Sequence, residues 1–209
     1  MLEIVTLVLG PVQTNTYIIA DTDTEEAAVI DPAWDGNQIV NEADQRGWQI
    51  GQIWVTHAHF DHIGGIKAVS SASNPPIPIA LHPEDLEMWR RGGGASVFGF
   101  HLEFGPEPAI ALRHGQILCL GNYSFEVRHV PGHSRGHIAL YCAQEGIMFC
   151  GDLIFHAAVG RTDLPGGNFD TLIHSIQTQV FSLPNETRLL PGHGYETTVG
   201  FERLNNPFL

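Results

Sequence analysis

The stretch Thr56-His57-Ala58-His59-Phe60-Asp61-His62 places four potential metal ligands within six residues. It follows the apolar run Ile53-Trp54-Val55, which is typical of a buried strand, and it precedes Gly64-Gly65. The ligands therefore stand where a strand ends and the chain turns. A polar loop with incidental histidines is the alternative, because the chain contains 12 histidines in 209 residues.

The spacing within this stretch favours a metal site. In an extended segment alternate side chains point the same way, so His57, His59 and Asp61 can face one spot. A turn would bring His62 alongside, and Asp61 can begin the next helix as its N-cap. Imidazole and carboxylate groups suit zinc and other borderline first-row ions. Four ligands this close can hardly all serve one ion, so we consider two neighbouring metals.

Three later segments repeat this arrangement of an apolar run, a turn and a metal-competent side chain. The side chains are reached through Pro131-Gly132-His133, Gly151-Asp152 and Pro191-Gly192-His193. Glycine or proline at each step lets the backbone turn sharply and approach an ion closely. Together with the first stretch, these segments supply seven ligand groups at predicted strand ends.

Composition sets broad limits on the class of protein. With 209 residues and 43% hydrophobic content, we expect one globular domain spanning residues 1–209. A formal net charge of −13 argues against a nucleic-acid surface. No apolar window is long enough for a transmembrane helix, so we expect no membrane partner. Three cysteines without secretory signs predict free thiols and a cytoplasmic location.

The apolar pattern predicts two runs of strands, each accompanied by helices. We expect strands at residues 4–9, 16–20, 27–30, 50–55, 77–81, 117–120, 123–130, 137–142, 147–150 and 188–190. We expect helices at residues 36–46, 63–71, 82–90, 169–181 and 198–205. Residues 91–108 lack periodicity and form the candidate mobile loop or lid. Such runs indicate two sheets packed face to face with helices outside.

Several motifs carry a resemblance to the metallo-β-lactamase superfamily, in particular to its type II glyoxalase-like (hydroxyacylglutathione hydrolase-like) branch. The matching segments are His57-Ala58-His59-Phe60-Asp61-His62, Pro131-Gly132-His133-Ser134-Arg135-Gly136-His137, Gly151-Asp152, Gly160-Arg161-Thr162-Asp163-Leu164-Pro165-Gly166-Gly167, Pro191-Gly192-His193-Gly194, and the tail from Thr197 to Phe208. The resemblance spans essentially the whole chain. It implies an α/β (α+β) fold, a four-layer αββα sandwich with the metal site at one edge of the sheets.

The resemblance also implies a division of the ligands between two ions. One ion would be held by His57, His59 and His133, the other by Asp61, His62 and His193, and Asp152 would bridge them. We expect two zinc ions, with iron or manganese possible at either site. Asp61 would have a second, catalytic role, because it can accept a hydrogen bond from a bridging water.

These expectations lead to a binuclear metal-dependent hydrolase. A metal-bridging hydroxide would attack a thioester, and the leading substrate is S-D-lactoylglutathione, cleaved to D-lactate and glutathione. The chain looks like a short form without the C-terminal helical region of larger relatives. Recognition of the glutathione-derived substrate would then come from elsewhere, such as the loop at residues 90–108. The oligomeric state is left open.

Four further residues are weaker candidates around the centre. Arg161 and Asp163 are predicted to form a buried ion pair that braces their loop, although Arg161 can instead contact substrate. His137 is expected to support the site rather than bind metal, because all seven ligand roles are filled. Tyr195 can line the pocket, and Asn15 can hydrogen-bond near the site.

Three alternatives remain from the sequence. One is a persulfide dioxygenase-like oxidoreductase with a single iron held by His57, His133 and Asp152. Another is a different ester or lactam hydrolase of the same superfamily. The third is a non-catalytic module in which the metals only hold the fold.

Overall fold

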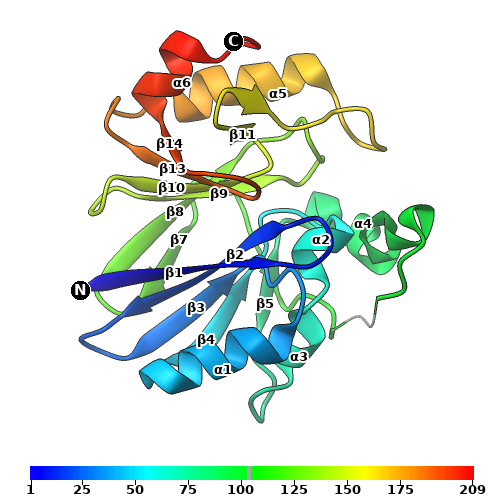
Figure 1. The fold of residues 1–209 in the computed structure, drawn as a ribbon, viewed down its shortest axis with the longest axis vertical. Helices are drawn as coiled ribbons and strands as arrows, with labels where there is room; N and C mark the ends of the chain where they lie inside the picture. The colour runs from blue at the N-terminus through cyan, green and yellow to red at the C-terminus, as the bar shows by residue number, and fades with distance from the viewer. Residues whose placement is uncertain (103–104) are drawn as a thin grey trace.

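The computed structural model describes residues 1–102 and 105–209, and over these ranges two six-stranded sheets lie face to face (Figure 1). The first sheet has the order β1-β2-β3-β4-β5-β6. Its strands are β1 (Leu2–Leu9), β2 (Thr14–Asp21), β3 (Glu26–Ile30), β4 (Gln49–Trp54), β5 (Ile79–Leu81) and β6 (Ile110–Ala111). Strands β1, β2 and β3 pair antiparallel, and β3 to β6 run parallel to one another.

The second sheet has the order β14-β13-β10-β9-β8-β7. Its strands are β7 (Ile117–Leu120), β8 (Tyr123–His129), β9 (Ile138–Cys142), β10 (Ile147–Gly151), β13 (Arg188–Pro191) and β14 (Thr197–Thr198). Only the β10–β13 pair among these strands is parallel. A separate short hairpin joins β11 (Ile154–Phe155) to β12 (Ala158–Val159).

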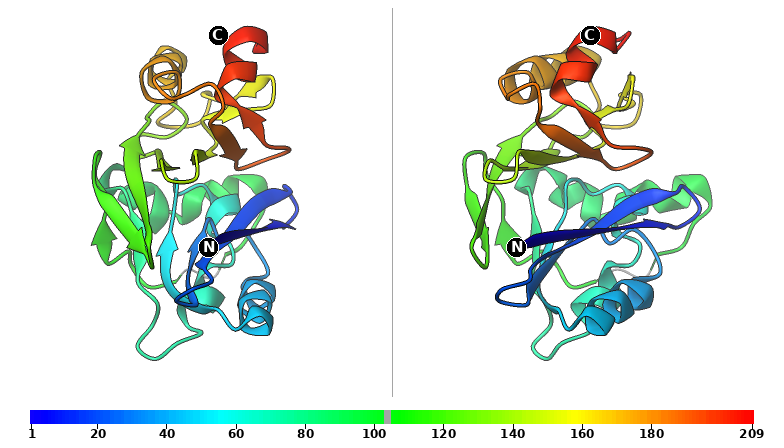
Figure 2. Two further views of the ribbon diagram at one scale, coloured as in Figure 1. Left: turned by 90° about the vertical axis from the view of Figure 1, so that its left-hand side faces the viewer. Right: turned by 60° about the vertical axis from the view of Figure 1, so that its left-hand side comes forward.

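Helices cover the outer face of each sheet, which makes four layers (Figures 1 and 2). The outer helices of the first sheet are α1 (Gly36–Arg46) and α3 (Ile66–Ser70). The second sheet is covered by α5 (Phe169–Ser175), which continues as the π-helical segment η3 (Ile176–Val180), and by α6 (Val199–Asn205). The segments that lie to the right in Figure 1 are α2 (Phe60–Ile63), the 3₁₀ turn η1 (Pro83–Asp85), α4 (Leu86–Arg90) and the 3₁₀ segment η2 (Gly92–Phe98).

Period-two alternation along the strands explains the layering. Ile53 of β4 packs in the cluster beneath the outer helices, whereas the next residue, Trp54, packs between the sheets. In β10, Met148 faces α5 and Phe149 faces the inter-sheet core. A strand whose two faces are both apolar needs cover on both sides, and the four-layer sandwich supplies it. The predicted αββα fold is confirmed.

The helix predicted at residues 63–71 is divided in the structure. Helix α2 begins earlier, at Phe60, and α3 begins at Ile66. Gly64 and Gly65 lie between them and press against the backbone of Ala33 and Trp34, where a Cβ would not fit. The close approach to this loop, rather than helix propensity, sets the break.

Other differences concern short elements and one helix cap. The strands β6, β11, β12 and β14 have only two residues each, too few to show an alternating apolar pattern in the sequence. The helix predicted at residues 169–181 changes to π geometry after Ser175. The prediction that Asp61 caps a helix is wrong, because His59 is the N-cap residue and Asp61 lies in the first turn. The three cysteines are free, as predicted. Over the described residues, no helix is long and apolar enough to cross a membrane.

Candidate metal centre

The carboxyl ends of five strands from the two sheets deliver the polar side chains of the centre. Sheet one contributes the segments that follow β3 and β4, and sheet two those that follow β8, β10 and β13. Parallel strands end at the same edge of a sheet, so residues that follow them gather there. The seven predicted ligands come together at this edge, and six of them are buried; His193 is partly exposed.

The first stretch of ligands reaches this edge in two conformations. The chain stays extended only as far as His59, and Asp61 and His62 belong to α2. The prediction of one extended segment from His57 to Asp61 is therefore wrong in its local geometry. A helical turn nevertheless brings Asp61 to the same centre, where it accepts a hydrogen bond of 3.2 Å from the Thr14 hydroxyl.

Three histidines form the first donor set. Nδ1 of His59 lies 2.8 Å from Nε2 of His133, which lies 3.2 Å from Nε2 of His57. The other ring nitrogen of His133, Nδ1, lies 2.7 Å from the carbonyl oxygen of Arg161, which accepts its hydrogen. That hydrogen bond leaves Nε2 of His133 as a lone-pair donor directed at His57 and His59.

Asp61, His62 and His193 form the second donor set. Oδ2 of Asp61 lies 3.3 Å from Nε2 of His193 and 3.6 Å from Nε2 of His62. Each set offers one atom per residue, and those atoms lie within 4.8 Å of one another. Sets of this size and composition match the nitrogen and oxygen ligands of first-row metals.

Asp152 lies between the two sets. Its Oδ2 is 3.6 Å from Nε2 of His133 and 3.5 Å from Nε2 of His193, and its Oδ1 is 3.3 Å from Nε2 of His62. One carboxylate thus approaches members of both sets. This is the position that a bridging ligand requires.

Burial and mutual charge set the protonation of these groups. Burial, and then the positive charge of neighbouring histidines, lowers the pKa of His59 to about 3 and that of His57 well below its usual range. Burial also lowers the pKa of His62, but the carboxylates of Asp152, Asp61 and Asp31 outweigh it and raise this pKa well above its ordinary value. His57 and His59 are therefore neutral and can donate lone pairs, whereas His62 lies among carboxylates that favour a positive charge.

The unpaired atoms of the centre fit a bound cation. Among the described residues, Nε2 of His62 and Oδ1 of Asp152 are buried without a hydrogen-bond partner. The imidazoles of His57, His59 and His133 also turn nitrogen atoms toward one another at hydrogen-bond distance. Buried polar groups in this state are costly unless something satisfies them, and a metal ion would do so in both sets.

Asp31 also lies near these donors but is already occupied. Its Oδ1 accepts the backbone N–H of Thr56 at 2.7 Å, and its Oδ2 accepts the Thr56 hydroxyl at 2.6 Å and contacts Nδ1 of His62 at 2.9 Å. Asp31 therefore orients His62 and the start of the stretch at residues 56–62, called here the ligand loop. Asp31 is not among the site residues predicted from sequence, although it follows β3 in the same strand-then-acid pattern that predicts Asp152.

Residues of β2 fasten the loop that carries His193. The Asn15 amide donates to the carbonyl oxygens of Pro191 at 3.0 Å and Gly194 at 2.9 Å, and the Tyr17 hydroxyl donates to Pro191 at 2.7 Å. The sequence predicts only that Asn15 can hydrogen-bond near the site and does not predict these partners. Thr14, which holds Asp61, carried no sequence signal because its role depends on contact between distant segments.

The four weaker candidates from the sequence differ in burial: His137 is buried, whereas Arg161, Asp163 and Tyr195 are exposed. His137 is buried, and its Nε2 accepts the backbone N–H of Asp152 at 3.1 Å, which places it behind a predicted ligand. Arg161 and Asp163 do form a bidentate ion pair, at 2.7 Å for each bond, but the prediction of burial is wrong: their side chains are 53% and 67% exposed. Tyr195 is 87% exposed and makes no hydrogen bond or ring contact with the described residues.

The candidate lid at residues 91–108 is partly helical, and its residues 103–104 lie outside the described ranges. Segment η2 packs directly on the ligand loop. The ring of Phe60, between His59 and Asp61, stacks on Phe98 at 5.2 Å and on Phe100 at 5.3 Å. Gly93 has φ +59°, and a Cβ there would overlap the backbone of Ala58 and Phe60.

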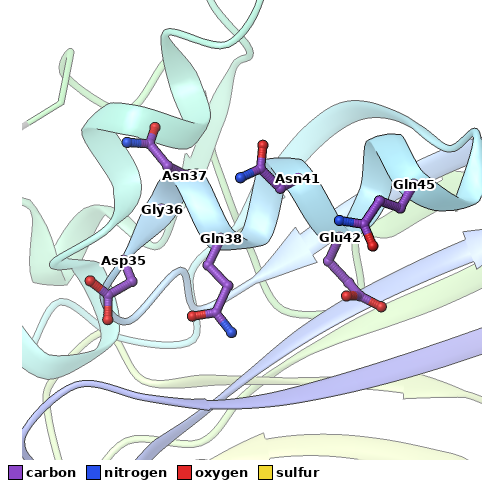
Figure 3. Close-up of a pocket in the computed structure, with 7 residues that line it drawn as sticks. All are labelled: Asp35, Gly36, Asn37, Gln38, Asn41, Glu42 and Gln45. Carbon is purple, nitrogen blue, oxygen red and sulfur yellow. The ribbon is translucent and has the colours of Figure 1, made fainter.

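A separate hollow of about 430 Å³ runs along the exposed surface of α1 (Figure 3). Its lining residues are Asp35, Gly36, Asn37, Gln38, Asn41, Glu42 and Gln45. Figure 3 shows them spaced along one helix rather than converging on a point. None of them belongs to the donor sets, so the candidate site is the metal centre.

Comparison with known proteins agrees with this fold and site. Residues 9–193 match the family model described as the metallo-beta-lactamase superfamily. The chain is 35% identical over 204 residues to the probable metallo-hydrolase YqgX of Bacillus subtilis, covering 96% of this chain and 94% of that protein. It is 32% identical over 208 residues to the hydroxyacylglutathione hydrolase GloC of Haemophilus influenzae, covering 94% and 93%.

Two solved structures resemble the whole chain. The BLEG-1 B3 metallo-beta-lactamase superposes with a TM-score of 0.92 and 34% identity, covering 100% of this chain and 99% of that chain. TTHA1623, solved in a di-iron-bound form, gives a TM-score of 0.89 and 37% identity, covering 98% and 100%.

The four-layer sandwich that gathers histidines and aspartates at one edge, together with these relatives, indicates a metal-dependent hydrolase. The chain belongs to the metallo-beta-lactamase superfamily, and within it to the metallo-hydrolases. Proteins of this superfamily bind divalent metals, which agrees with the paired donor sets.

Proposed function

We propose that this protein is a binuclear metal-dependent thioester hydrolase, with S-D-lactoylglutathione as the leading substrate. The relation to GloC, a hydroxyacylglutathione hydrolase, supports this choice of substrate. One divalent ion would be held by His57, His59 and His133, and the other by Asp61, His62 and His193. Zinc and iron both suit such donors.

The position of Asp152 carries the proposal. Its Oδ2 lies at nearly equal distances, 3.6 and 3.5 Å, from one histidine of each donor set. A carboxylate shared between two cations lowers their mutual repulsion, so both ions can sit close together. Two cations bound there would lower the pKa of water towards neutrality and would polarise the carbonyl group of a thioester.

The chain's own residues would orient the reacting groups. Asp61, which accepts a hydrogen bond from the Thr14 hydroxyl, would accept a hydrogen bond from the attacking water and so orient its lone pair toward the acyl carbon. The carbonyl oxygen of Arg161 and the carboxylate of Asp31 hold the rings of His133 and His62 from behind. Burial of the donors limits competition from bulk water.

The test is an assay of purified protein whose metal content has been measured. Protein with two metal ions per chain should cleave S-D-lactoylglutathione with release of thiol, and Asp61→Ala should abolish turnover while it retains the circular dichroism spectrum of the wild type. Two bound metals without cleavage of this or any related thioester would reject the proposed reaction. Oxygen consumption with glutathione persulfide by protein that contains one iron would replace it with dioxygenase chemistry.

Lactam hydrolysis is the second candidate function. The superposition on BLEG-1, a B3 metallo-beta-lactamase, over the full chain favours it. The chemistry is closely related, because both reactions attack a carbonyl carbon. A chromogenic cephalosporin assayed beside the thioester, on the same metal-loaded preparation, separates the two through their ratio of kcat/KM values.

A further inference from the structure

Asp85 is a buried carboxylate that connects the two loops of the first donor set. It ends η1, and its side chain is inaccessible to solvent. Oδ2 accepts the backbone N–H of Ala58 at 3.1 Å and the Ser134 hydroxyl at 2.7 Å. Oδ1 accepts the backbone N–H of Gly136 at 2.6 Å.

Each of these donors adjoins a residue of the centre. Ala58 stands between His57 and His59 on the loop that follows β4, and Ser134 follows His133 on the loop that follows β8. The two loops come from different sheets, and one backbone hydrogen bond, from the N–H of Ile138 to the carbonyl oxygen of Thr56 at 2.9 Å, joins them where the first begins and the second ends. Through one carboxylate, Asp85 joins them.

Asp85 packs closely against Gly136 of the loop that follows β8. A Cβ on Gly136 would lie 2.6 Å from the backbone nitrogen of Asp85, so only glycine allows the loop that follows β8 to approach Asp85 this closely. Hydrogen bonds to a charged acceptor are about twice as strong as neutral ones. A buried carboxylate with three such bonds is held firmly, and it holds its donors in turn.

Not every buried carboxylate in this chain has such a position. Asp21 is equally inaccessible and joins the two sheets through the backbone and side-chain amides of Asn122, at 2.8 and 2.7 Å. It stands at the end of β2, and its hydrogen-bond partners are not adjacent to any predicted ligand. It therefore provides a matched control for the general cost of losing a buried carboxylate.

We propose that Asp85 is a positioning residue that sets the spacing of the His57–His59 pair relative to His133, and thereby the metal affinity of the first donor set. The second donor set, Asp61, His62 and His193, takes no hydrogen bond from it. This inference rests on the proposed function, in that the two sets bind separate ions. Loss of a residue that orients metal ligands commonly weakens metal binding about 10–100-fold.

The experiment measures zinc affinity at each set by competition with a chromophoric chelator. In a His193→Ala background, which weakens the second set, Asp85→Asn should lower the remaining affinity at least about tenfold. In a His59→Ala background, which weakens the first set, Asp85→Asn should leave the affinity within twofold. Asp21→Asn should leave both affinities within twofold.

Two outcomes would overturn the role of Asp85: an unchanged affinity at the first set, or an equal loss at both sets. If Asp85→Asn does not fold, Ser134→Ala removes one of the three hydrogen bonds and should lower the first affinity severalfold; no loss in that variant also rejects the role. Wild-type protein that binds no zinc would instead reject the metal centre, and the proposed function with it. If the wild-type protein binds two zinc ions but Asp85→Asn behaves in one of these unexpected ways, only the role of Asp85 is rejected and the proposed function stands.

Discussion

Oδ2 of Asp31 lies 2.9 Å from Nδ1 of His62, and this contact directs the other ring nitrogen, Nε2, at Asp61 and Asp152. Asp31 also accepts both donors of Thr56, so one carboxylate joins the end of β3 to the start of the ligand loop. The orientation of His62 is therefore set from the core side of the centre.

Asp31→Asn should weaken metal binding at the second donor set. Asparagine cannot accept all three donors, so His62 would lose its fixed ring orientation, and we expect a loss of affinity of about 10–100-fold. Chelator competition in the His59→Ala background measures it. Asp35→Asn is the matched control, because Asp35 lies on the same loop but is exposed and caps no helix with its side chain. Equal affinities in the two variants would show that Asp31 does not orient His62.

Thr14→Val should reduce kcat without removing a metal ligand. The Thr14 hydroxyl donates to Oδ2 of Asp61, and valine keeps the shape of the side chain while it loses this donor. One hydrogen bond contributes about 0.5–1.5 kcal/mol, so the expected loss in kcat is roughly 2–12-fold, far less than for Asp61→Ala. Steady-state kinetics at measured metal content provide the test. A variant as inactive as Asp61→Ala would mean that Thr14 does more than position the carboxylate.

Much of this centre follows from sequence because its ligands obey a local rule. Apolar runs of period two end in a turn and a metal-competent side chain, and parallel strands bring such ends to one edge. That rule locates His57, His133, Asp152 and His193, and the same apolar runs locate the sandwich. The resemblance to a known family then divides the ligands between two ions.

The residues behind the ligands follow no local rule. Thr14 and Asp85 reach the centre from segments 47 and 49 positions away from their partners Asp61 and Ser134, and their types are common in turns and helix starts. The exposure of the Arg161–Asp163 pair also depends on how its loop lies on the finished fold. Such facts are set by tertiary packing, which one-dimensional patterns do not encode.

Removal of the metal ions should lower the melting temperature. A ligand that binds only the folded state stabilises it by about 4 kcal/mol when present at a thousand times its Kd. For a chain of this length, 1 kcal/mol corresponds to roughly 2–4 °C. We therefore expect chelation to lower the Tm by roughly 8–16 °C. Differential scanning calorimetry with and without chelator measures the shift, and zinc should restore it; identical melting curves would contradict metal binding at the buried donors.

Gly93→Ala should destabilise the protein more than Gly94→Ala. Both glycines have positive φ, +59° and +81°, so alanine at either costs about 1–2 kcal/mol of backbone strain. Only at position 93 would the new Cβ also overlap the backbone of Ala58 and Phe60, whereas nothing lies within 4 Å at position 94. Urea unfolding of metal-loaded protein measures the free energy of unfolding. Equal losses would mean that η2 does not pack closely on the ligand loop.

Asp21→Asn should remove a contribution to stability that is present at neutral pH and is lost in acid. The backbone N–H of Asn122, together with other donors, lowers the pKa of the Asp21 carboxyl in the folded state. A lowered folded-state pKa means that the contribution is complete above the unfolded-state pKa of about 3.9 and is lost as the pH falls through the lower, folded-state value.

Metal-free wild type should therefore unfold at a higher urea concentration than Asp21→Asn at pH 7, and this difference should shrink as the pH falls below about 4. Metal-free protein is used for both chains so that release of metal does not enter the comparison. Glu145→Gln, which removes an exposed carboxylate in the β9–β10 turn, should match wild type at every pH. A gap between wild type and Asp21→Asn that stays constant down to pH 2 would show that the charge of Asp21 does not stabilise the contact between β2 and the β7–β8 turn.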